Sequence, residues 1–301
     1  MNTVNPTVSV WVSAYNHEEY IEQAIMSIVN QTYQDFELLV IDDGSSDKTP
    51  EILEKLSQQY GFFFEKQENQ GLPRTLNKLV RMAKGEYITG CASDDFWPEP
   101  RLEEQIQFFN SNPEAKIVHG MVEYVDKSGH SSGAKLHFSQ LADGCKSYYN
   151  LLLRRKRYQT GTLMVHREVF ETVGYYDEDI EVEDRDFITR ATRCFNLHAR
   201  PSVWSYHRKH GKNWTAVRSG IEKIIRSNLL TMKKLPALDG LLFLYGFTPY
   251  WFLMSWKHKL PHRLVFFLVF PLFLFNLKYY RVLARVLVGE QGLKYLNRKR
   301  L

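Results

Sequence analysis

The chain has 301 residues, of which 44% are hydrophobic and 24% are charged, a composition typical of a folded protein and not of a disordered one. Its three cysteines, Cys91, Cys145 and Cys194, show no C-x-x-C spacing, which argues against a disulfide framework or a zinc site and suits a reducing compartment. The first 20 residues lack a basic start and an apolar core, so we expect no signal peptide.

The net charge of +5 is unevenly distributed along the chain. Residues 251–301 carry ten Lys/Arg and one acid, a net charge of +9, whereas the other 250 residues carry a net charge of −4. A basic segment on a mildly acidic body indicates a polyanionic surface as partner. Because this segment is also the most aliphatic and aromatic part of the chain, we expect that surface to be a membrane and not a nucleic acid.

Apolar runs and helical patterns alternate over the first 125 residues. The sequence predicts strands at 7–12, 36–41, 61–65, 87–92 and 116–124, and helices at 19–31, 49–60, 72–83 and 100–109. Strands that alternate with helices indicate βαβ units, and hence an α/β fold with a mostly parallel sheet.

Polar clusters follow three of these predicted strands. The first strand is followed by Ser13 to Asn16, the second by Asp42 to Asp47, and the fourth by Ser93, Asp94 and Asp95. In open α/β sheets, ligands bind at the carboxyl ends of the strands, so we expect these clusters to share one edge. For the adjacent acids Asp94 and Asp95, two hypotheses stand: a helix cap, or a divalent cation held against a phosphate.

The middle of the chain has weaker signals. Residues 126–147 are rich in Gly, Ser and Lys and are predicted to form a mobile loop, and no internal repeat is visible. A strand is expected at 162–166, and a helix that begins with acids at 183–194.

Four segments together resemble the family 2 glycosyltransferases of the GT-A fold. They are VSVWVSAYNHEEYIEQAIMSIVNQTYQDFELLVIDDGSSDKTPEIL (8–53), NQGLPRTLNKLV (69–80), GEYITGCASDDFWPEPRLEEQ (85–105) and VGYYDEDIEVEDRDFITRA (173–191). The resemblance implies sugar transfer from a nucleotide-diphosphate donor to a hydroxyl, with inversion and with Mn²⁺ or Mg²⁺. It also implies a nucleotide-sugar-binding half at 1–125 and an acceptor-binding half at 126–230, followed by a helical tail at 231–301.

The resemblance assigns donor contacts position by position. Ala14 and Tyr15, with the adjoining Asn16, would line the base pocket, and Asp43 would read the nucleobase edge. Arg74 would lie near the base or the diphosphate. Asp43 and Arg74 suit a uracil edge, so we expect a UDP-linked sugar, with GDP and dTDP donors left open. The simpler alternative for Asp43 is a turn-forming Asp before Gly44.

The resemblance also assigns roles to the adjacent acids Asp94 and Asp95, which would contact the ribose and the metal. By resemblance Asp94 contacts the ribose and Asp95 ligates the ion that bridges the diphosphate. A divalent cation neutralises the charge of the leaving diphosphate and needs oxygen ligands that leave room for phosphate. The sequence reads Ser93-Asp94-Asp95, not the Asp-x-Asp of many relatives, so fewer carboxylates are available to the metal.

The acceptor hydroxyl requires a base to take its proton. The family places this base in EVEDRDF, so we expect Asp184 to fill the role, with Glu183 as the second candidate. Both acids would also favour the start of a helix through its dipole, and the two roles are compatible.

Three further residues complete the predicted site. His210, in SYHRKHGKNW, would complete the metal shell or touch the diphosphate, although a structural histidine is the simpler hypothesis. Arg208 would contact the diphosphate. Trp97 would stack on an acceptor sugar, or else belong to the core or rim.

The C-terminal tail has two uncharged runs, 240–256 and 264–277, both short for a membrane-spanning helix of about 20 apolar residues. Residues 279–288 follow as a basic amphipathic helix. We expect a segment that lies on the membrane; a spanning hairpin and a soluble helical tail are the alternatives.

These features together predict the cellular role. By resemblance, the acceptor is a glycan, lipid-linked or on the bacterial cell surface, as in lipopolysaccharide, O-antigen or capsule synthesis at the cytoplasmic face of the inner membrane. The Gln-x-x-Arg-Trp motif of processive synthases is absent, so single sugar additions are expected. The competing hypotheses are a sugar-nucleotide nucleotidyltransferase, against which the first loop SAYNHEEY argues, and a non-catalytic scaffold.

Overall fold

The computed structural model describes residues 5–135, 137–211, 213 and 217–257. The described strands are β1 (Val8–Ala14), β2 (Phe36–Asp42), β3 (Phe63–Lys66), β4 (Tyr87–Ala92), β5 (Ile117–Val125), β6 (Ser131–Lys135), β7 (Met164–His166) and β8 (Leu197–Arg208). The helices among them are α1 (Ile21–Val29), α2 (Thr49–Tyr60), α3 (Leu72–Met82), α4 (Arg101–Ser111), α5 (Ser147–Leu152), α6 (Arg167–Val173), α7 (Asp184–Cys194), α8 (Arg218–Lys234) and α9 (Ala237–Lys257). Two short 3₁₀ helices, η1 (Phe138–Gln140) and η2 (Thr160–Thr162), lie between α4 and α6.

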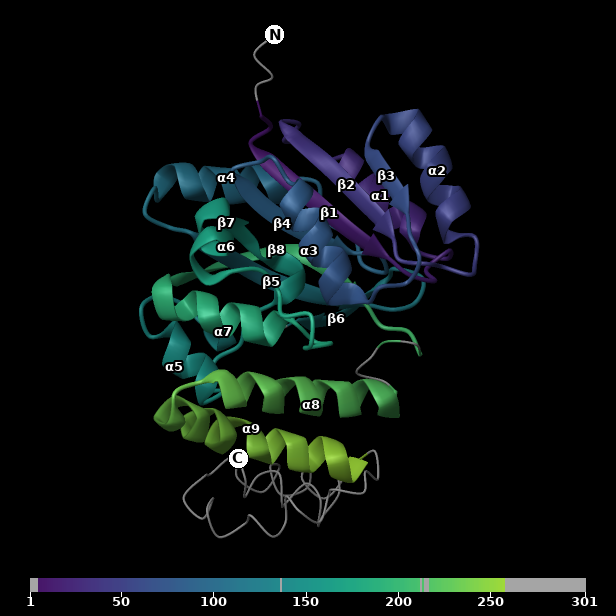
Figure 1. Ribbon diagram of the computed structural model, residues 1–301. Coiled ribbons are helices and arrows are strands. Elements are labelled where there is room, and N and C mark those ends of the chain that lie inside the picture. Colours follow the sequence, from purple (N-terminus) through teal and green to yellow (C-terminus); the bar gives the residue numbers. More distant parts are fainter. Residues whose placement is uncertain (1–4, 136, 212, 214–216, 258–301) are drawn as a thin grey trace. The chain divides into compact units, whose positions relative to one another are not determined.

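The strands form one eight-stranded sheet in the order β3-β2-β1-β4-β7-β5-β6, with β8 paired to β5 (Figure 1). The pairs β2–β3, β1–β2, β1–β4 and β5–β8 are parallel, whereas β7 and β6 add antiparallel pairs. The predicted α/β class with a mostly parallel sheet flanked by helices is confirmed. The parallel strands β1, β2 and β4 end at one edge, which brings their polar ends together.

Both faces of the central sheet are covered by helices, because alternate side chains of each strand point to opposite faces. In β2, Leu38 and Val40 pack in a core with α1, α2 and α4. Leu39 and Ile41 pack in a second core with α3, α6 and α7. These central strands are therefore buried on both faces, which fixes the edge where they end.

The second core is extended by Trp11 of β1, which packs against a glycine on the neighbouring strand β4. Gly90 in β4 lies opposite Trp11 in β1, and a Cβ at Gly90 would lie 2.1 Å from the Trp11 indole. Gly90→Ala is expected to lower the free energy of unfolding by about 1–3 kcal/mol, since the added methyl forces a rearrangement of the packed ring. Urea unfolding checks this, with Gly211→Ala as the control, because a Cβ at Gly211 meets nothing within 4 Å. Equal stability of the two variants would contradict the packing.

The segment predicted as a loop, 126–147, contains more structure than expected. Strand β6 pairs antiparallel with β5, and η1 follows it. All five residues of β6 are exposed, so the sequence shows no apolar alternation there. The loop prediction was wrong for this segment because the backbone pairing with β5 does not depend on buried side chains.

Three further helices, α5, α6 and α8, and the strand β8 also had no prediction. Strand β8 contains Pro201 and pairs with β5 through two register irregularities, so its burial does not alternate. It nevertheless carries His207 and Arg208 to the sheet edge that holds the predicted site.

The chain divides into two compact units, residues 1–151 with 156–210, and residues 152–155 with 211–301. The first unit holds the sheet. In the second, Arg154 stacks on Tyr250 of α9, with 3.5 Å between the guanidinium and the ring centroid. Within the described residues no helix combines the length and hydrophobicity needed to cross a membrane. The runs 264–277 and 279–288 lie outside the described residues.

Candidate active site

The loop after β1 is locked to the loop after β2. Asn16 adopts a positive φ of 54°, and its backbone N–H donates to Ser45 Oγ at 2.8 Å. Its side-chain Oδ1 accepts from the Ser46 N–H at 2.8 Å. Asn is among the residues that tolerate this conformation, so a local turn positions Tyr15, whose side chain is 49% exposed, at the edge.

The two acids that end β2 have separate roles. Asp42 is fully buried and accepts hydrogen bonds from the backbone and hydroxyl of Ser45. Asp43 accepts from the N–H groups of Gln70 and Gly71 at 2.9 and 3.0 Å, and from Gln67 Nε2 at 2.8 Å. Asp43 is therefore held in one orientation by the loop that leads into α3, and its Oδ2 keeps acceptor capacity for a ligand.

The other predicted base-pocket residues differ in accessibility. Ala14 is fully buried, and its carbonyl accepts from the Asp43 N–H at 2.8 Å, so it shapes the backbone and does not offer a side chain. Arg74 is exposed and pairs with Glu178 at 3.3 Å. Figure 1 shows the starts of α2 and α3 near the ends of β1 and β2.

Three side chains whose arrangement could hold a metal ion lie where β4 ends. One ligand atom from each of His17, Asp94 and His210 lies within 4.8 Å of the other two. His210 Nε2 is 3.0 Å from Asp94 Oδ2, and both side chains are largely buried. Burial lowers the pKa of His17, against the opposing charge of Asp94. The sequence had no prediction for His17, although a histidine in the polar turn after a strand was a signal available to it.

The fit of this group to a divalent cation can be tested on its geometry. Ligand atoms about 2.1 Å from one ion lie about 3.0 Å apart when adjacent and about 4.2 Å apart when opposite. His210 Nε2 and Asp94 Oδ2 form a hydrogen bond at 3.0 Å, and this spacing equals that of two adjacent ligands. Two imidazoles and a carboxylate are ordinary ligands for divalent transition ions. The residues present therefore fit a metal.

Asp95 faces away from this group, toward β8. Its Oδ2 is 3.0 Å from His207 Nδ1, and its Oδ1 accepts from the Arg208 N–H at 2.9 Å. Burial raises the pKa of Asp95, although its hydrogen bond to His207 opposes the shift. Burial also acts to lower the pKa of His207, but the hydrogen bond and charge of Asp95 outweigh it and raise that pKa. Both Asp95 oxygens are thus engaged, and Asp94 occupies the place that we expected Asp95 to take.

Two predicted contacts need correction, because the side chains point inward. Trp97 is 3% exposed and stacks beneath the guanidinium of Arg101 at 3.7 Å, so it belongs to the core and cannot stack on an acceptor. Arg208 is also buried, and its guanidinium donates to the carbonyls of Asp94 and Lys127 and to Gln23 Oε1. A guanidinium used in this way holds the loop and is not free for a diphosphate.

The predicted base lies at the start of α7, beside η2. Asp184 Oδ2 accepts from Thr160 Oγ1 at 2.8 Å and from the Tyr158 hydroxyl at 3.1 Å. Burial, and then the charge of Asp184, raise the pKa of its neighbour Glu183 to about 8. Glu183 thus holds a proton at neutral pH and is not available to accept one. Tyr158 and Thr160 had no role in the sequence prediction.

The turn η2 connects this base to the acid pair. Thr160 bonds Asp184, and a Cβ at the next residue, Gly161, would lie 3.9 Å from Asp95 Oδ2. The fully buried Arg101 fixes the turn by donating to the Gly161 carbonyl at 2.7 Å. Asp184 and Asp95 therefore lie on two sides of one short, anchored turn.

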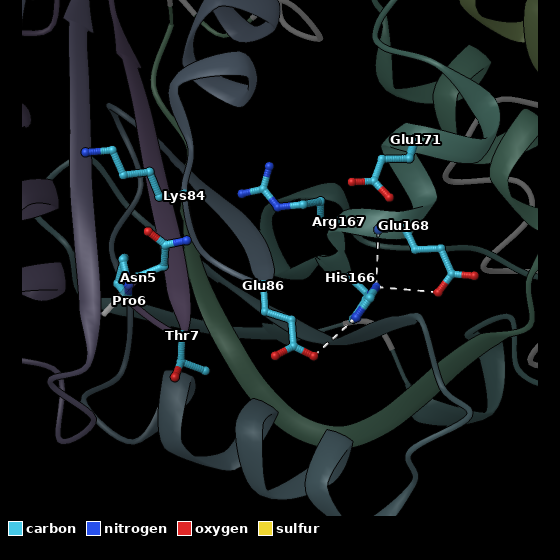
Figure 2. A pocket seen from close by; sticks show the side chains of 9 residues that line it. All are labelled: Asn5, Pro6, Thr7, Lys84, Glu86, His166, Arg167, Glu168 and Glu171. Carbon is cyan, nitrogen blue, oxygen red and sulfur yellow. Dashed lines mark hydrogen bonds and ion pairs between the residues drawn. The ribbon is translucent and has the colours of Figure 1, made fainter. Parts of the chain in front are cut away.

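A separate cavity of about 350 Å³ opens at the other edge of the sheet, where β1 and β4 begin (Figure 2). His166 Nε2 lies 3.2 Å from Glu86 Oε1, and its Nδ1 lies 3.7 Å from Glu168. Figure 2 shows these side chains paired with one another, with Lys84 and Glu171 at the sides. The cavity contains none of the predicted site residues.

Comparisons with known proteins show the family of the chain. A family model described as glycosyl transferase family 2 matches residues 9–174. A relative from Haemophilus influenzae, described as an uncharacterized glycosyltransferase, is 32% identical over 185 residues, which is 60% of this chain and 70% of that relative. One from Rickettsia typhi is 28% identical over 232 residues, 71% of this chain and 67% of the relative.

Solved structures show the same fold. S. aureus TarS 1–349 in complex with UDP-GlcNAc has a TM-score of 0.65 at 18% identity, covering 93% of this chain and 91% of that one. The mannosyltransferase PcManGT from Pyrobaculum calidifontis, in complex with GDP-Man and Mn²⁺, has a TM-score of 0.61 at 17% identity, covering 95% and 88%. The fold is that of a GT-A glycosyltransferase. With the family model matching more than half of its length, the chain belongs to glycosyltransferase family 2.

Proposed function

We propose that this glycosyltransferase moves a single sugar from a UDP-linked donor to a hydroxyl of a lipid-linked glycan, with inversion and with a divalent cation. The observation that supports this most is the arrangement around η2, which has Asp184, the base that we propose, on one side and Asp95 of the acid pair on the other. Direct displacement needs a proton acceptor near a stabilised leaving group, and we propose that Asp184 and a cation beside Asp94 serve these two purposes.

The chemistry follows from the two sides of the turn. The acceptor oxygen attacks the anomeric carbon, its proton passes to Asp184, and the bond to the UDP oxygen breaks on the opposite face. A bound cation would neutralise the negative charge that develops on the diphosphate. Thr160 and Tyr158 hold Asp184 in place, so that the carboxylate reaches the hydroxyl without reorientation.

The donor assignment rests on the loop after β2. Asp43 is fixed by the segment leading into α3 and retains an acceptor position for the N–H of a pyrimidine ring. The exposed ring of Tyr15 offers a surface for the nucleobase. Arg74, in the first turn of α3, adds a positive charge and pairs with Glu178. Relatives of this fold have been solved with UDP-GlcNAc and with GDP-Man, which supports a nucleotide sugar.

The acceptor and the location are inferred from the C-terminal segment. Residues 251–301 combine a net charge of +9 with the uncharged run 264–277, a composition that suits binding to an anionic membrane surface. An enzyme held at the cytoplasmic face of the inner membrane would meet acceptors carried on lipid. We therefore propose a lipid-linked glycan of the cell surface as acceptor.

Calorimetric binding of UDP to the detergent-purified full chain tests the donor assignment. We expect binding that requires Mn²⁺ and that is stronger than binding of GDP or dTDP, because the site couples a pyrimidine contact to a metal-held diphosphate. Asp43→Ala should weaken UDP binding at least about tenfold, since it removes the nucleobase acceptor and frees the loop. If none of the three nucleotides binds, with or without Mn²⁺, the donor function is rejected and a non-catalytic scaffold is favoured.

A further inference from the structure

The group formed by His17, Asp94 and His210 includes one residue, His17, for which the sequence predicted no role in metal binding. Asp94 follows β4 and His210 follows β8, whereas His17 follows β1. The rings of His17 and His210 meet edge to face, with centroids 6.0 Å apart. The ring of Tyr20 also packs against the ring of His210, with centroids 5.1 Å apart. Three separate loops thus direct one nitrogen or oxygen each to a common point.

The His17 ring is held as metal-binding histidines are held. Its Nδ1 forms a 2.7 Å hydrogen bond with the buried hydroxyl of Ser93, the residue before Asp94. Its backbone N–H donates to Thr49 Oγ1 at 2.9 Å. A ligating histidine ordinarily uses its second ring nitrogen to bond a neighbouring polar group, which fixes the ring and leaves the first nitrogen for the ion. Ser93 fills that role here, so Nε2 remains for the cation.

We propose that His17, Asp94 and His210 together ligate the catalytic cation, and that this triad makes the site selective for Mn²⁺ over Mg²⁺ and able to bind it before the nucleotide. The proposal rests on the proposed function, since the ion is the one that serves the donor diphosphate. Asp94 takes the ligand position because Asp95 is engaged by His207 and the Arg208 N–H.

The selectivity follows from the donor types. Imidazole nitrogen suits transition ions, whereas Mg²⁺ prefers oxygen ligands and retains water. The order of binding follows from the number of donors. A site with one or two carboxylates is completed by substrate phosphates, but three protein donors hold an ion without them. The open positions of the ion would remain for the diphosphate.

Mn²⁺ binding to the nucleotide-free, detergent-purified full chain tests the proposal, with free Mn²⁺ measured by electron paramagnetic resonance. We expect saturable binding of one ion, retained in a tenfold excess of Mg²⁺. Ser93→Ala keeps the ligand but releases the ring, so a loss of about tenfold is expected, as for other outer-shell partners. His17→Gln removes the ligand itself and should weaken the binding further, by about a hundredfold or more. His198→Gln, at the far end of β8, is the matched control and should bind as the original chain does.

The outcomes separate this proposal from the proposed function. Binding of Mn²⁺ with unchanged affinity by both the His17→Gln and Ser93→Ala proteins would overturn the triad. So would Mn²⁺ binding that appears only after UDP is added, or equal affinity for Mg²⁺. In each of these cases UDP binding would still stand as evidence for donor recognition. Tight Mn²⁺ binding without any nucleotide binding would uphold the triad and reject the donor function.

Discussion

Asp184→Asn is expected to lower kcat by about 10²–10⁴-fold while leaving UDP-sugar binding unchanged, because the amide cannot take the proton of the acceptor hydroxyl. Asparagine has the shape of aspartate, and its carbonyl oxygen can still accept from Thr160 and Tyr158, so the turn η2 should keep its position. The measurement is UDP release from the donor in the presence of a lipid-linked acceptor extract, together with calorimetric donor binding to the same preparation.

The matched control is Asp179→Asn, an exposed acid in the turn before α7. It removes the same charge near the same helix and should leave turnover within about twofold, since surface substitutions have small effects. Transfer at the original rate by the Asp184→Asn protein would reject Asp184 as the base. An equal loss of donor affinity and turnover would mean that Asp184 serves binding, and the displacement mechanism would need another proton acceptor.

The central sheet could be predicted because its side-chain pattern reflects burial on both faces. The runs VSVWVSA and FELLVID consist largely of residues that favour strands, and each is bounded by polar or turn-forming residues. The polar clusters then had to share the carboxyl edge, since parallel strands end together. Strand β8 could not be found in this way because Pro201 and its irregular register with β5 remove the alternation.

Orientation of individual side chains is the part of the site that the sequence could not supply. Asp94 and Asp95 are adjacent and chemically identical, and only the position of β8 decides that Asp95 faces His207 while Asp94 faces His210. The same holds for Arg208, whose guanidinium is drawn inward by carbonyls from residues far away in the chain. Such contacts depend on tertiary structure, so a local pattern names candidate residues but not the direction in which they point.

Glu183→Gln is expected to stabilise the protein by several kcal/mol at alkaline pH and by only about 1 kcal/mol near pH 5. Burial, and then the charge of Asp184, raise the pKa of Glu183 to about 8 in the folded state, whereas an exposed glutamate in the unfolded chain has a pKa of about 4.3. Between these values the unfolded state releases the proton and the folded state keeps it. The free energy of unfolding therefore falls as pH rises through this window, by about 1.36 kcal/mol per pH unit for one group, and Gln removes this contribution.

Urea unfolding at pH 5 and at pH 8.5 measures the effect, since the difference between the original chain and the variant isolates one group from all others that titrate. Glu54→Gln, exposed in the middle of α2, is the control and should change stability by the same small amount at both pH values. The difference in free energy of unfolding between the Glu183→Gln protein and the original chain could instead be the same at both pH values. That result would mean that Glu183 is ionised in the folded state. The pair would then carry two adjacent negative charges, and Glu183 would compete with Asp184 for the acceptor proton.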